Sequence, residues 1–123
     1  GLKVTPIPVV HAVVETIGYL FEFPGARSLA YLPDVKRIPD VSMDLLRDVD
    51  VLVVDALREA SHPTHFSLQE ALAAVVAIRP KETWLTHLSH EHHVEEVAKT
   101  LPQGVRMAWD GLRISLNDVP GLA

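Results

Sequence analysis

The sequence contains no cysteine, which excludes a disulfide framework and a cysteine-based zinc ribbon within the chain. Basic residues are few: 11 Lys and Arg stand against 16 Asp and Glu, and the formal net charge is −5. Because phosphate contacts need clustered cations, this balance argues against a nucleic-acid-binding surface. The sequence also lacks a run of about 18 apolar residues and a signal-peptide pattern. We therefore expect no membrane contact and a cytoplasmic protein.

The 123 residues, 48% of them hydrophobic, suffice for one domain with its own core. A β-meander comes first, and Pro6 and Pro8 place its first strand at a sheet edge. Strands and helices then alternate, and Asp110-Gly111 predicts a closing hairpin. Ser67 and Glu70 form a capping box before the second helix. The predicted strands are 4–10, 16–23, 28–32, 49–54, 83–88, 105–109 and 112–116, and the predicted helices are 40–47, 67–78 and 91–100.

Two of the predicted helices cover only one face of such a sheet. Val51 to Val54 is a continuous apolar run, typical of a strand that is covered on both faces, so the second face needs another layer. Without that layer, a large apolar face would meet water, and we expect either a homo-oligomer or a missing N-terminal half. The sequence starts at Gly1 without a methionine, which is compatible with a fragment.

Residue types that bind metals lie at the ends of three predicted strands: His11, Asp34 and His87. Imidazole and carboxylate groups bind zinc and manganese, and such a cation makes a hydroxide nucleophile from bound water near neutral pH. An aspartate can bridge two cations through its two oxygens. Each residue alone also fits a plainer interpretation, because a histidine after a strand is commonly a hydrogen-bonded loop residue. Asp34 could equally be a turn or cap residue.

Seven motifs follow one another along the chain: V-T-P-I-P-V-V-H, G-Y-L-F-E, Y-L-P-D, V-L-V-V-D, H-F-S-L-Q-E-A, W-L-T-H-L-S-H and W-D-G-L. Their order and spacing resemble the C-terminal half of the metallo-β-lactamase superfamily. Within it, the chain is similar to the cyclic phosphodiesterases that act on phosphoribosyl cyclic phosphate in phosphonate breakdown. The resemblance implies an α/β fold in which residues 1–123 form a single half-domain, the C-terminal half of an αββα sandwich. It also implies two divalent ions, zinc or manganese, in a complete site.

By this resemblance His11, Asp34 and His87 are the later metal ligands, and Asp34 bridges the two ions. His65 matches the histidine that protonates the leaving oxygen in the phosphodiesterase branches. His90 matches a histidine that joins upstream cysteines around a structural zinc. The first metal motif of the superfamily, H-x-H-x-D-H, appears nowhere in the chain. We therefore expect that the N-terminal half is missing and that the chain alone is inactive.

Two further residues are candidates. Asp55 ends a predicted strand and resembles a carboxylate that supports a metal ligand from behind, although a satisfied turn residue explains it equally well. Arg58 could hold a substrate phosphate through two N–H donors, but a loop arginine is more often merely solvated. The function that results is a metal-dependent phosphodiesterase for a small, cyclic phosphate diester. Two alternatives stay open: a non-catalytic half-domain for assembly, and another hydrolase of this fold such as a tRNA 3′-end nuclease.

Overall fold

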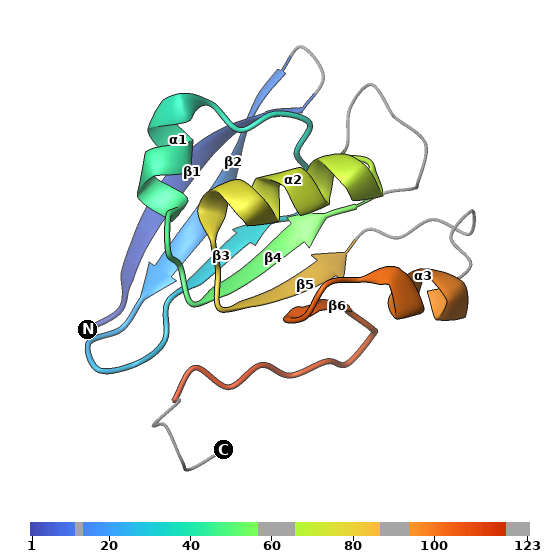
Figure 1. The fold of residues 1–123 in the computed structure, drawn as a ribbon. Coiled ribbons are helices and arrows are strands. Elements are labelled where there is room, and N and C mark those ends of the chain that lie inside the picture. The colour runs from blue at the N-terminus through green and yellow to red at the C-terminus, as the bar shows by residue number, and fades with distance from the viewer. Residues whose placement is uncertain (12–13, 57–65, 87–93, 118–123) are drawn as a thin grey trace.

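The computed structural model describes residues 1–11, 14–56, 66–86 and 94–117. Within these residues six strands form one sheet, and their spatial order follows their order in the sequence. The first three strands form the expected antiparallel meander, and the last three join it in parallel (Figure 1). The strands are β1 (Lys3–His11), β2 (Val14–Glu22), β3 (Leu29–Leu32), β4 (Val51–Asp55), β5 (Glu82–Thr86) and β6 (Val105–Met107).

Strand β1 lies at an edge of the sheet, as its two prolines predict. Pro6 and Pro8 have no amide donor, so they are tolerated where one side of a strand has no continuous partner. β1 pairs with β2 along its whole length. On its other side, the described residues include an isolated bridge between Val10 and Arg37. The edge position therefore follows directly from residue types that the sequence displays.

The described residues include three helices: α1 (Asp40–Leu46), α2 (Leu68–Ile78) and α3 (Val94–Thr100). The predicted capping box at the start of α2 is confirmed. The Glu70 amide donates to Ser67 Oγ at 3.2 Å, and the Ser67 amide donates to Glu70 Oε1 at 3.0 Å. α2 ends where predicted, and the next residue, Arg79, adopts the left-handed conformation with φ 59°. None of these helices is long and apolar enough to cross a membrane.

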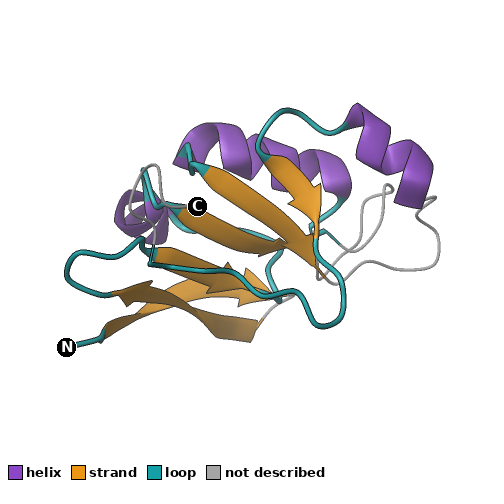
Figure 2. Cartoon of the chain, turned by 90° about the horizontal axis from the view of Figure 1, so that it is seen from below, coloured by secondary structure: helices purple, strands orange, loops and turns teal. Residues whose placement is uncertain are grey.

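The hydrophobic core lies between the helices and one face of the sheet. Leu52 and Leu85 point into it from β4 and β5, and Ala74 fills it from α2. Among the described residues, no helix covers the opposite face, which we call the outer face (Figure 2). Four apolar residues on the β1–β3 part of the outer face are between 41% and 49% exposed. They are Val4, Ile17, Tyr19 and Tyr31.

The predicted closing hairpin is wrong in its second strand. Asp110-Gly111 do form a turn, in which the Leu112 amide donates to Trp109 O at 3.1 Å. Residues 112–117, however, are in no strand. They run towards the turn before β3, where the Arg27 amide donates to Leu116 O at 2.8 Å. The local turn signal is correct, but a distant partner decides where the segment lies.

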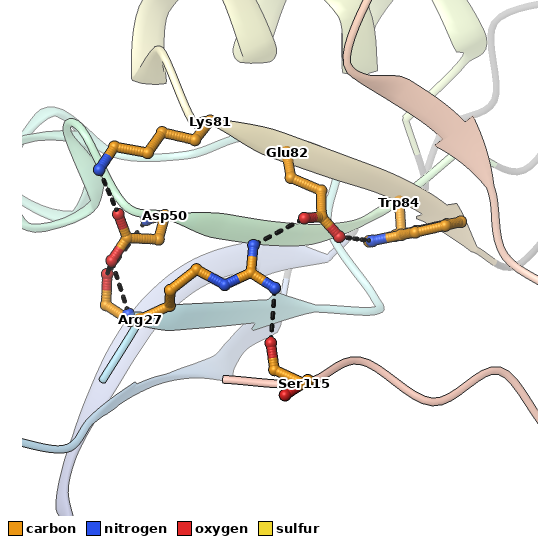
Figure 3. A network of polar contacts seen from close by, with 7 residues as sticks. Arg27, Asp50, Lys81, Glu82, Trp84 and Ser115 are labelled. Atoms are coloured by element: carbon orange, nitrogen blue, oxygen red, sulfur yellow. Dashed lines mark hydrogen bonds and ion pairs between the residues drawn. The ribbon is translucent and has the colours of Figure 1, made fainter. Parts of the chain in front are cut away.

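Opposite charges pair at the edge where the parallel strands begin (Figure 3). Arg27 Nη1 lies 2.7 Å from Glu82 Oε1, and Lys81 Nζ lies 3.0 Å from Asp50 Oδ1. Asp50 Oδ2 also accepts hydrogen bonds from the amide and hydroxyl of Ser28 at 2.8 and 3.1 Å. Burial works to raise the pKa of Asp50 and Glu82, but these bonds outweigh it and leave each pKa below its ordinary value. Both carboxylates are therefore charged at neutral pH, and the network ties β3, β4 and β5 together.

Candidate functional site

Two candidate ligands, His11 and Asp34, lie near the opposite edge, where the parallel strands end. β2 runs antiparallel to β1 and to β3, so β1 and β3 share a direction, and β4 and β5 are parallel to β3. The carboxyl ends of these strands therefore meet at one edge, which is where open α/β sheets bind ligands. His11 ends β1, Asp34 lies two residues after β3, and Thr86, directly before His87, ends β5. The sheet thus brings His11 and Asp34 to a common edge.

Asp34 lies in a loop, residues 33–37, that we call the Asp34 loop. The loop is tied to the end of β1, because the amides of Lys36 and Arg37 donate to Val10 O at 2.7 and 3.2 Å. In return, the Val10 amide donates to Arg37 O at 2.9 Å. Since Val10 directly precedes His11, these bonds fix the backbone at one candidate ligand relative to the loop that contains the other.

Asp55 supports the Asp34 loop from the end of β4. Its side chain is fully buried, and its Oδ2 accepts a hydrogen bond from the Val35 amide at 3.2 Å. Val35 is adjacent to Asp34, so the carboxylate acts on the backbone that positions the candidate bridging ligand. A buried carboxylate in such a place needs hydrogen-bond donors, and this amide is one of them. Its contribution to a metal site stays a prediction.

The start of α2 is attached to the same loop. The Phe66 amide donates to Val35 O at 2.7 Å. Lys36 Nζ lies 2.7 and 2.8 Å from the two carboxylate oxygens of Glu70, the acidic member of the capping box. Burial works to raise the pKa of Glu70, but the bonds from Lys36 and Ser67 outweigh it, so the pKa is lowered. Glu70 therefore stays ionised and joins the helix start to the loop.

Four sequence-predicted residues, His65, His87, Arg58 and His90, lie outside the described residues. Within residues 1–11, 14–56, 66–86 and 94–117, no group of three or more His, Asp or Glu side chains could hold a metal ion. Two of the candidate metal ligands are described, the imidazole of His11 and the carboxylate of Asp34. Both kinds of group bind zinc and manganese. In its chemistry this pair fits a divalent ion, and His87 would have to complete the set. The metal role of all three stays a prediction.

Lys36 was not singled out from the sequence. It stands in a short Lys-Arg pair, and nothing local connects it to Glu70, 34 positions further along the chain. The capping box identified Glu70 as a helix-start residue, but such a motif says nothing about a third partner. This contact could be predicted only with the knowledge that the Asp34 loop packs beside the start of α2.

A family model described as the beta-lactamase superfamily domain matches residues 1–88. The chain belongs to the metallo-β-lactamase superfamily. The fold agrees with that of a diphosphatase from the PhnP family, with a TM-score of 0.84. The two sequences are 43% identical, and the match covers 91% of this chain and 42% of the diphosphatase. This similarity supports the expected likeness to that branch. The chain spans less than half of the diphosphatase, so the activity of the complete protein does not pass to it by similarity alone.

More distant structures share the fold. Human tRNase Z, short form, is 22% identical over 94% of this chain and 42% of its own, with a TM-score of 0.74. Zinc-bound PqqB from Methylobacterium extorquens is 22% identical over 94% of this chain and 51% of its own, with a TM-score of 0.78. A curated relative, an octanoyltransferase of Porphyromonas gingivalis, is 27% identical over 95% of this chain but only 23% of its own length. The two solved structures support the superfamily fold, and at these identities they support no more than the fold.

Proposed function

We propose that this chain is the C-terminal part of a metal-dependent phosphodiesterase that hydrolyses a small phosphate diester, such as a cyclic one. The observation that carries the proposal is the common edge of His11 and Asp34, with the Asp34 loop held by hydrogen bonds to Val10 and Asp55. The similarity to a diphosphatase favours attack at phosphorus over other reactions of the superfamily. Zinc or manganese fits the donors, with two ions in a complete site.

In this proposal His11, Asp34 and His87 hold the ions, together with ligands from an H-x-H-x-D-H motif on an N-terminal half. When bound, divalent ions lower the pKa of a coordinated water towards neutrality and offset negative charge on phosphate oxygens. His65 donates a proton to the leaving oxygen as its bond to phosphorus breaks, while the oxygen of water forms the new bond to phosphorus. Arg58 binds a non-bridging oxygen through two N–H donors. His90 contributes to a structural zinc.

The outer face of β1–β3 supports a second part of the proposal. Its exposed aliphatic and aromatic side chains form the kind of surface that packs against another layer. We propose that its occupant is a second β-layer from the N-terminal half, because the similar diphosphatase has more than twice the length that this chain spans. Light scattering on the 123-residue chain separates the alternatives: a homodimer would favour a self-assembling, non-catalytic module, and a well-folded monomer would contradict the need for a second layer.

Two other functions have less support. At 22% identity, the similarity to human tRNase Z supports a shared fold and no shared substrate. The net charge of −5 also argues against a tRNA-binding surface. Octanoyl transfer is not proposed, because the match covers 23% of that relative. The phosphodiesterase proposal is therefore the one to test first.

The test compares two variants of the full-length polypeptide that the gene encodes. Asp34→Ala should lose bound metal and activity together, because it removes a ligand. His65→Ala should slow turnover roughly a hundredfold or more and keep the metal, because it removes only a proton donor. Metal content by atomic absorption and turnover of a small cyclic phosphate diester and of a diphosphate are the measurements.

The opposite pattern, with metal lost in His65→Ala and kept in Asp34→Ala, would show that the two roles are wrongly assigned. Turnover of the diphosphate alone would move the substrate class from diesters to anhydrides. The 123-residue chain by itself should show little or no turnover with added zinc or manganese.

A further inference from the structure

Two links join the Asp34 loop to the start of α2, one through the backbone and one through side chains. The backbone link is the hydrogen bond from the Phe66 amide to Val35 O at 2.7 Å. The side-chain link is the ion pair between Lys36 Nζ and the two Glu70 oxygens at 2.7 and 2.8 Å. We call this ion pair the Lys36–Glu70 latch. Each link begins one or two residues after Asp34, so both act on the same short stretch of loop.

The latch also acts on the helix start. Glu70 Oε1 accepts the Ser67 amide at 3.0 Å while it contacts Lys36, so one carboxylate holds both the loop and the first turn. Phe66 and Ser67 are buried at this junction. His65 directly precedes Phe66 in the sequence, and the Phe66 backbone is anchored to the Asp34 loop.

We propose that Lys36 is a positioning residue: through the latch to Glu70 it holds the Asp34 loop in a fixed relation to the start of α2. The inference rests on the proposed function, in which Asp34 binds metal and His65 donates a proton. Both groups must then keep a constant separation, because small misplacements of reacting groups reduce the rate strongly. The latch is well placed to maintain it, since it connects the two segments that lead to these residues.

Two simpler roles for Lys36 predict different effects of its substitution. As a surface ion pair that only stabilises the fold, the latch would contribute little to the free energy of unfolding, because its side chains are 23% and 36% exposed. As a phosphate-binding residue, Lys36 would direct its ammonium group at substrate, whereas both Glu70 oxygens already lie within 2.8 Å of it. The positioning role predicts a loss in kcat, the phosphate role a rise in KM, and the stabilising role a lower melting temperature alone.

The experiment uses the full-length polypeptide and two variants that break the latch. Lys36→Met removes the charge and keeps the length of the side chain, and Glu70→Gln keeps an oxygen for the Ser67 amide. Each should lower kcat about tenfold with KM changed less than about twofold. The double variant should be no slower than either single variant, since both remove one contact. Lys36→Arg, which can bind a carboxylate with two donors, should recover most of the rate.

Lys81→Met is the matched control. Lys81 pairs with Asp50 at 3.0 Å at the opposite edge of the sheet, so the same substitution breaks a lysine–carboxylate pair there, although Lys81 is more exposed than Lys36. It should leave kcat unchanged. A rise in KM without loss of kcat in Lys36→Met would overturn the positioning role in favour of phosphate binding. An unchanged kcat with a lower melting temperature would overturn it in favour of stability.

Amide hydrogen exchange tests the latch without reference to activity. The Phe66 amide should exchange roughly fivefold faster in Lys36→Met than in the wild type, because its bond to Val35 O is the remaining link and opens more often. The Val35 amide, which donates to Asp55 Oδ2, should also exchange faster, because the loop that contains it is then held less firmly. Both amides should be unaffected in Lys81→Met. If the wild-type protein hydrolyses no phosphate ester, the proposed function is wrong. Amide exchange then still tests whether the latch holds the Asp34 loop. Unchanged exchange at Val35 and Phe66 overturns the latch whatever the activity.

Discussion

Asp50 directly precedes strand β4 and Asp55 ends it, and each accepts a hydrogen bond from a backbone amide beside β3. Asp50 Oδ2 accepts the Ser28 amide at 2.8 Å before β3 begins, and Asp55 Oδ2 accepts the Val35 amide at 3.2 Å after β3 ends. Asp50 also pairs with the exposed Lys81, whereas Asp55 is fully buried behind the loop that contains Asp34. The same local contact therefore stabilises the sheet at one edge and supports a candidate site at the other. The two hydrogen bonds are alike, so the difference between the two roles comes from the residues around each bond.

The sharpest test of this comparison replaces each aspartate in the full-length polypeptide. Asp55→Ala should lower activity at least about tenfold, because it removes the support of the Asp34 loop. It should also cost about 1–3 kcal/mol of unfolding free energy, since the Val35 amide loses a buried partner. Asp50→Ala should cost about 1–2 kcal/mol and leave activity unchanged. Denaturant unfolding and steady-state kinetics are the measurements, and equal losses of activity in both variants would show that the two edges do not differ.

A smaller effect should follow from Arg27→Met at the edge where the parallel strands begin. Arg27 contacts Glu82 Oε1 at 2.7 Å and donates to Ser115 O at 2.5 Å, so it joins β5 to the C-terminal segment. Its loss should reduce the unfolding free energy by about 1–2 kcal/mol. Proteolysis should then cut more readily within residues 112–117, as judged by mass spectrometry. Greater sensitivity elsewhere, with this segment still protected, would contradict the assigned anchor.

The smallest expected effect is a pH dependence of the charged network. Because the pKa of Glu82 lies below its ordinary value of 4.5, the ionised form stabilises the fold above that pH. The contribution is lost as the pH falls through the lower pKa of the folded state. Glu82→Gln should therefore destabilise the protein by about 0.5–1 kcal/mol at pH 7 and by less near pH 4. Urea unfolding at both pH values measures the difference, and an equal penalty at both would refute it.

Much of the fold could be predicted because its signals are local. Pro6 and Pro8 mark an edge strand, and the spacing of Ser67 and Glu70 marks a helix start, since each depends on hydrogen bonds within a few residues. The alternation of strands and helices along the chain follows from similarly local signals. The candidate residues His11 and Asp34 were also accessible, because strand ends can be located from the apolar runs before them. Their meeting at one edge then requires only the strand directions.

The failures of prediction involve distant partners. Leu112–Leu116 has the composition of a strand, and Asp110-Gly111 is a turn, yet Arg27 holds the segment away from β6. The Lys36–Glu70 latch spans 34 positions and has no local signature. Thus the sequence by itself determined the elements, their order and the residue types at the strand ends. Only the tertiary structure decided which charges pair and where the last segment lies, because those choices depend on groups that folding brings together from far along the chain.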